Sequence, residues 1–115
     1  MTAAHRIEIT PFGGRVRVRV GGGIVADTAH ALLLEEGSLA PVFYIPRGDV
    51  HMERLAPSAT TSHCPFKGDA SYFSAEGGPA DVAWSYEAPL PAAADIAGHL
   101  AFYPNKAGIE TVPFG

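Results

Sequence analysis

Apolar and polar residues alternate along much of the first third of the chain, and this alternation predicts strands. In residues 15–20, three arginines alternate with three valines, so the valines are predicted to face the core and the arginines the solvent. The glycines at 21–23 favour a tight hairpin turn, and residues 24–26 begin the return strand. A phosphate-binding nest is the weaker interpretation of these glycines, because no P-loop lysine or helix follows them.

Further apolar runs, separated by glycine and proline, predict more short strands. The segments with this pattern are residues 7–10, 29–36, 42–45, 50–53, 70–74, 82–86 and 99–103. Residues 29–36 also fit a short helix, and the neighbouring strands favour a strand there. Residues 55–62 are predicted to be irregular, and residues 105–115 to form a loose tail.

One stretch, residues 92–97, has good helix formers, with Pro91 before it and Gly98 placed to end it. The sequence therefore predicts a mainly β chain. We expect a single compact antiparallel β-rich domain over residues 1–115, with one short helix near 91–98.

Composition narrows the classes of function. The 115 residues are 47% hydrophobic, which is enough for a core, and the formal net charge of -4 argues against a nucleic-acid partner. No apolar run approaches the roughly 20 residues of a membrane helix, so no membrane partner is expected. The single cysteine excludes an internal disulfide framework and favours the cytoplasm. Cys64 and the five histidines lack metal-ligand spacing, so neither a metal nor another cofactor is expected.

A cysteine-centred motif and the segments around it carry a family resemblance. In chain order they are Asp49-Val50 through Leu55 and Ser58, His63-Cys64-Pro65-Phe66-Lys67-Gly68-Asp69-Ala70-Ser71-Tyr72-Phe73-Ser74, Ala83-Trp84-Ser85-Tyr86, Pro89-Leu90-Pro91 and Ile96-Ala97-Gly98-His99-Leu100-Ala101-Phe102-Tyr103. Over about residues 15–103 this pattern resembles the domain of unknown function 427 family. The resemblance implies a β-tent fold in small soluble proteins, mostly of bacteria and fungi, and implies little about activity.

The family also carries a nucleotidyltransferase label, and the residues speak against that chemistry. Nucleotidyl transfer needs carboxylates gathered on a divalent metal, usually as a close Asp-x-Asp pair. The chain contains no Asp-x-Asp, Asp-x-Glu or Glu-x-Glu, and the adjacent Glu35 and Glu36 would face opposite sides of a strand.

The cysteine motif supplies the candidate catalytic residues, Cys64, Lys67 and Asp69. Cys64 precedes a proline, which holds it in extended backbone, and Lys67 would lie close enough to lower the pKa of the thiol if the loop folds back. The alternative interpretation is a small buried cysteine beside a solvated turn. Pro65 and Gly68 predict a sharp turn that holds Lys67 at a defined place, and a site, if present, is expected where residues 63–69 meet Tyr72, Trp84 and Tyr86, with Lys67 directed into it. Because surface substitutions change stability little, we expect Lys67→Ala to leave folding nearly intact.

Aromatic residues suggest the wall of a ligand pocket. The candidate ligand-binding residues are Tyr44, Tyr72, Trp84 and Tyr86, with Lys67 and Arg47 supplying positive charge. The sequence thus favours a binding module for a small anionic or nucleotide-like ligand. Two alternatives stay open: a small enzyme that uses Cys64 as nucleophile or Lys67 as acid, base or anion clamp, and a structural or protein-interaction domain whose aromatic residues are all core.

Overall fold

The computed structural model describes residues 6–115, whose regular structure consists mostly of short strands. The elements are β1 (Ile7–Pro11), β2 (Gly14–Val20), β3 (Gly23–Thr28), β4 (Leu32–Glu36), β5 (Val42–Tyr44), η1 (Arg47–Asp49), η2 (Met52–Arg54), β6 (Leu55–Cys64), β7 (Gly68–Ala75), β8 (Ala83–Ser85), η3 (Pro91–Ile96), β9 (Ala101–Phe102) and β10 (Gly108–Pro113). The predicted mainly β, antiparallel fold with one short helical segment near 91–98 is confirmed.

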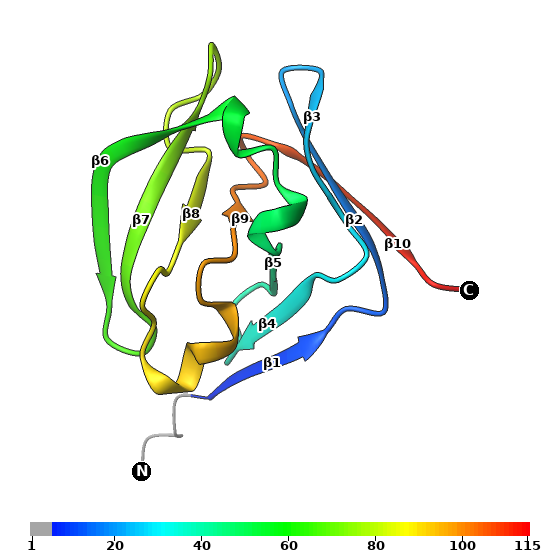
Figure 1. Cartoon of the computed structure of the whole chain (residues 1–115). Helices are drawn as coiled ribbons and strands as arrows, with labels where there is room; N and C mark the ends of the chain where they lie inside the picture. The colour runs from blue at the N-terminus through cyan, green and yellow to red at the C-terminus, as the bar shows by residue number, and fades with distance from the viewer. Residues whose placement is uncertain (1–5) are drawn as a thin grey trace.

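The strands form three antiparallel sheets, with the orders β1-β4-β5, β10-β2-β3 and β6-β7-β8-β9. An isolated bridge between Ile45 and Leu100 joins the first sheet to the third, and one between Ala26 and Val50 joins β3 to the chain after η1. Figure 1 shows the four-stranded sheet and the β10-β2-β3 sheet inclined toward each other like two sides of a tent, with β1 and β4 at the open end.

The alternating residues 15–20 form most of β2, as predicted. Val16 and Val18 are fully buried, and Val20 packs at the edge of the same cluster. The arginines between them point outward and hold carboxylates: Arg15 and Arg17 pair with Asp27, and Arg19 pairs with Glu110. The turn into β3 is made by Gly21 and Gly22, whose φ angles of 58° and 87° favour glycine.

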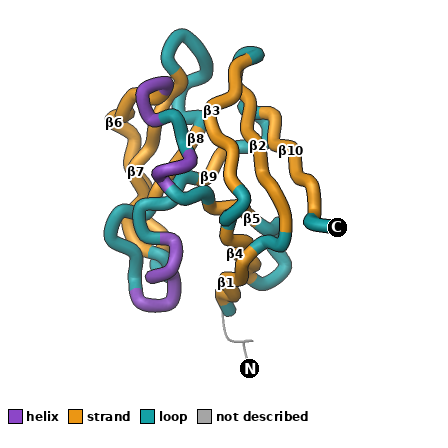
Figure 2. Tube along the Cα trace, turned by 45° about the vertical axis from the view of Figure 1, so that its right-hand side comes forward, coloured by secondary structure: helices purple, strands orange, loops and turns teal. Residues whose placement is uncertain are grey.

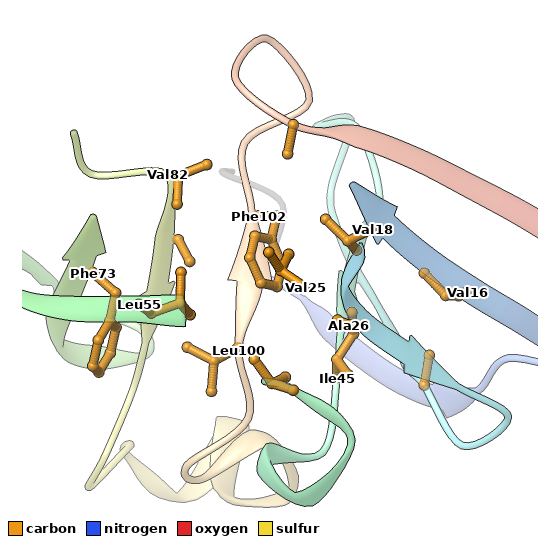
Figure 3. Packing of buried hydrophobic residues seen from close by; sticks show 14 residues of the cluster. Val16, Val18, Val25, Ala26, Ile45, Leu55, Phe73, Val82, Leu100 and Phe102 are labelled. Carbon is orange, nitrogen blue, oxygen red and sulfur yellow. The ribbon is translucent and has the colours of Figure 1, made fainter. Parts of the chain in front are cut away.

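Two apolar clusters cover the two faces of the β6-β7-β8-β9 sheet. The first lies between this sheet and β2-β3, and it includes Phe73, Val82, Leu100 and Phe102 (Figure 3). The second lies on the opposite face, with Tyr44, Tyr86 and Ile96 among its buried residues. Because successive side chains of a strand alternate between faces, a three-residue strand such as β8 contributes to both clusters.

The predicted helix over residues 92–97 exists as a 3-10 helix, η3, that is kinked at Ala93. Ala93 and Ile96 are its buried residues, and they pack in the second cluster. Gly98, at a φ of 71°, follows the helix as predicted.

Three expectations about secondary structure are wrong. Residues 55–62 were expected to be irregular but lie in β6, a strand at a sheet edge whose register shifts after Pro57, so that apolar alternation is missing. Residues 50–53 were expected to form a strand, and residues 52–54 instead form η2. Residues 105–115 were expected to be loose, but β10 pairs along β2 from Gly108 to Pro113. The side chains of β10 are mostly exposed, so its sequence lacks the apolar pattern that would predict this strand.

Candidate functional site

The cysteine motif forms the turn between β6 and β7. Cys64 and Gly68 are cross-strand partners, and the backbone N–H of Lys67 donates to the carbonyl oxygen of Cys64 at 3.2 Å. Gly68 has a φ of 109°, a backbone conformation that residues other than glycine rarely adopt. The sharp turn predicted from Pro65 and Gly68 is therefore confirmed.

A second segment fixes this turn from outside. The backbone N–H of Leu90 donates to the carbonyl oxygen of Lys67 at 2.9 Å, so the proline-flanked segment before η3 lies against the turn. The backbone of residues 88–90 lies 3.5 to 3.6 Å from the position of a side chain at Gly68, which is ordinary contact. Gly68 is thus required for its backbone angle and not for lack of space.

Lys67 points into the protein, and its burial shows that the expectation of a nearly intact fold in Lys67→Ala, which treated the change as a surface substitution, is wrong. Its amine forms an ion pair with the carboxylate of Glu36 at the end of β4, and only 11% and 9% of the two side chains are exposed. The amine also lies 6.0 Å from the centre of the Tyr86 ring, within range of a cation–π contact. The pair joins the β6–β7 turn to a different sheet.

The role of Glu36 as the partner of Lys67 was not predicted from the sequence. Strand alternation places it on the same face as Leu34, which is buried, while Glu35 points to solvent. The opposite orientations expected for Glu35 and Glu36 are confirmed. An acidic residue in phase with a buried leucine was the signal that could have identified Glu36 as the partner of an inward lysine.

The four predicted aromatic residues meet in the second cluster. Tyr72 and Trp84 are cross-strand partners on β7 and β8, and the Trp84 indole N–H donates to the Tyr44 hydroxyl at 3.1 Å. The rings of Tyr44 and Trp84 meet edge to face, with centroids 6.3 Å apart. Tyr86 is buried in the same cluster.

Tyr103, which was not predicted, completes this aromatic group. Its ring lies 4.5 Å from Trp84 and stacks on Tyr72 at 6.5 Å between centroids. The Tyr72 hydroxyl shares a hydrogen bond of 2.9 Å with Ser62. Tyr103 ends the strand predicted at residues 99–103, but no pattern in the sequence shows which strands become neighbours.

Burial makes three of these tyrosines weaker acids. It raises the pKa of Tyr86 to about 12, and it also raises the pKa of Tyr44 and Tyr103. The phenols therefore stay protonated and act as hydrogen-bond donors or packing surface near neutral pH.

Arg47 interacts with a different set of residues from Lys67. Its guanidinium pairs with Glu87 and donates to the carbonyl oxygen of Gly98, both at 3.0 Å. It also lies 5.6 Å from the centre of the Phe73 ring, a residue of the first cluster. The two cations chosen from the sequence thus each hold a carboxylate.

The two remaining candidate residues, Asp69 and Cys64, differ in their exposure to solvent. Asp69 is exposed and shares a hydrogen bond of 2.7 Å with the Nδ1 of His63, its cross-strand partner. Cys64 is partly buried against the second cluster. No group of three or more potential metal ligands occurs among residues 6–115.

A groove lies beside Trp84. It has a volume of about 420 Å³ and lies between β5, the end of β9 and β10. The residues that line it are Ala40, Pro41, Val42, Phe43, Trp84, Phe102, Pro104, Ile109 and Thr111. One wall therefore depends on β10, the strand that the sequence did not predict.

Comparisons with known proteins show a family whose description names no activity. No helix among the described residues has both the length and the apolar character needed to cross a bilayer. No curated protein matches the sequence. A family model described as a domain of unknown function (DUF427) matches residues 8–113, which is nearly the whole chain, so the protein belongs to the DUF427 family.

Proposed function

We propose that this domain binds a small, neutral and largely apolar molecule in the groove beside Trp84. The observation that carries the proposal is the lining of the groove, which offers an indole and two phenylalanine rings and, among residues 6–115, no charged side chain. Its volume of about 420 Å³ falls within the range of small-molecule sites, which are concave and mostly apolar.

The polarity of the groove decides the class of ligand. Thr111 contributes the one hydroxyl side chain of the lining, so a single polar group on the ligand is enough to orient it. A flat ring would lie against Trp84, whose side chain is only partly covered by its neighbours.

An anionic ligand held by Lys67 and Arg47, the hypothesis from the sequence, is supported less well. Lys67 pairs with Glu36 and Arg47 with Glu87, so an anion at either cation would compete with a carboxylate already in place. The aromatic wall expected from the sequence keeps its place in the proposal through Trp84.

The experiment uses Trp84, the only tryptophan of the chain, as the reporter. We would titrate the protein with benzamide and with benzoate, which share a ring and differ in charge, and follow tryptophan fluorescence and saturation-transfer NMR. Saturable binding of benzamide in preference to benzoate supports the proposal. Preference for benzoate, or no saturable binding of either, contradicts it.

A matched pair of variants locates the site. Thr111→Arg places a long charged side chain in the groove from an exposed position on β10, and it should abolish the benzamide response. Thr10→Arg makes the same change at an exposed position of β1, and it should leave the response intact. Equal responses in the two variants would place binding elsewhere.

A cytoplasmic site of action belongs to the same proposal, and it is supported by the single cysteine. An enzyme that uses Cys64 or Lys67 stays a prediction from the sequence, and the amine of Lys67 is engaged by Glu36.

A further inference from the structure

A second cavity, of about 530 Å³, lies between the tips of two turns. One is the β2–β3 turn at glycines 21–23, the other is the β7–β8 loop at residues 75–78, and η2 lies beside both. Figures 1 and 2 both show the two turns at the same end of the molecule, away from η3. The glycines let a ligand approach the backbone closely, because they carry no side chains.

Arg54 supplies the positive charge of this cavity. Its backbone is fixed at 2.9 Å on both sides, by its N–H to His51 and by its carbonyl oxygen to the N–H of Glu76. A side chain at Gly23 would come within 2.7 Å of the guanidinium, so the arginine lies directly on the glycine turn. Among residues 6–115 Arg54 forms no ion pair, in contrast to the arginines of β2.

Two carboxylates share the cavity with Arg54. Glu53 and Glu76 both line it, and neither is paired with the guanidinium within the described part of the chain. Glu53 lies 3.4 Å from His51, on the exposed side of η2. Val20, Val25 and Ala75 add an apolar surface. A cation and two carboxylates therefore border one space, and no ion pair joins Arg54 to either carboxylate within residues 6–115.

From this arrangement we infer that the cavity binds a free α-amino acid with an apolar side chain. Its carboxylate would be held by Arg54, its ammonium group by Glu53 or Glu76, and its side chain by the two valines. The charges fit a zwitterion better than a simple anion, because two carboxylates near Arg54 would repel an anion. This site is separate from the groove beside Trp84, since the two share no lining residue.

Three related probes test the charge requirement by isothermal titration calorimetry. L-Valine carries both charges, L-valinamide only the ammonium group, and N-acetyl-L-valine only the carboxylate. The proposal expects L-valine to bind about tenfold or more tightly than either analogue, because each analogue loses a charge-assisted hydrogen bond. Equal affinities, or no binding of L-valine, would overturn the proposal.

Two arginine variants assign the site. Arg54→Gln should weaken L-valine about tenfold or more and leave L-valinamide unchanged, whereas Arg15→Gln, at an exposed arginine of β2, should alter neither. Thr111→Arg should retain L-valine binding, which separates a failure here from a failure of the groove proposal. Unchanged L-valine binding in Arg54→Gln would refute the assignment.

Discussion

Replacing Lys67 by methionine tests whether the buried ion pair stabilises the fold. Methionine keeps most of the length of the side chain and removes its charge, while the Glu36 carboxylate stays about nine-tenths buried. Removing one partner of a buried ion pair costs about 3 to 5 kcal/mol, a large part of the roughly 5 to 15 kcal/mol by which domains are stable. We therefore expect the free energy of unfolding to fall by about 3 kcal/mol.

The double variant Lys67→Met/Glu36→Leu separates the two causes of this loss. An apolar pair of similar size often equals or exceeds a buried ion pair in stability, so the double variant should regain most of the loss. The control is Lys106→Met, whose exposed amine donates to the backbone carbonyl oxygen of Ala80 at 2.9 Å, and it should change stability by less than about 1 kcal/mol.

Urea unfolding followed by circular dichroism and by Trp84 fluorescence measures these values. Coincident transitions and a constant dependence on urea concentration would show that the comparison is valid. If Lys67→Met stayed within about 0.5 kcal/mol of the unchanged protein, Lys67 would behave as a surface residue, and the argument from burial would be refuted.

Four other outcomes are expected. Gly68→Ala should destabilise the protein by about 1 kcal/mol or more in urea unfolding, whereas Gly13→Ala, with open space and no positive φ, should cost little. Removing residues 108–115 should abolish the cooperative thermal transition, because β2 loses a neighbour; a truncated protein that melts normally would show that β10 is dispensable. Burial raises the pKa of Tyr86 from 10.0 to about 12, so the folded state holds the phenol proton more tightly than the unfolded state does. The free energy of unfolding should therefore be unaffected below pH 10 and fall as the pH rises from 10 to 12. Ultraviolet titration of tyrosinate in native and unfolded protein would detect the difference in pKa. Cys64 should react with iodoacetamide more slowly in the native protein than in urea, and a faster native reaction would favour the enzyme hypothesis.

Local patterns predicted the parts of the fold that local physics decides. The alternation in residues 15–20 determined the buried face of β2, and Pro65 with Gly68 determined the turn. The burial of Lys67 was not predictable in this way, because its neighbours in the chain are typical of an exposed turn. Its partner Glu36 lies 31 residues away, and only the packing of two sheets brings them together.

The candidate site also has a part that the sequence predicted and a part that it did not. Tyr72 and Trp84, both chosen from the sequence for the aromatic wall, are neighbours because the consecutive strands β7 and β8 pair. The groove escaped prediction because β10 has few buried side chains, so its sequence reads as a tail although its backbone completes a sheet. A polar strand at a sheet edge is recognised by its hydrogen-bonding partner and not by its own composition.

The position of β2 between β3 and β10 has a consequence for synthesis of the protein. Arg19 and Glu110, which pair across this sheet, are 91 residues apart, so β2 and β3 emerge from the ribosome long before β10 does. During that interval the backbone of β2 presents an open edge to which another nascent chain can pair. Closure of the sheet is therefore a late, long-range event, and slow elongation near residues 108–113 would lengthen the period in which this edge is open.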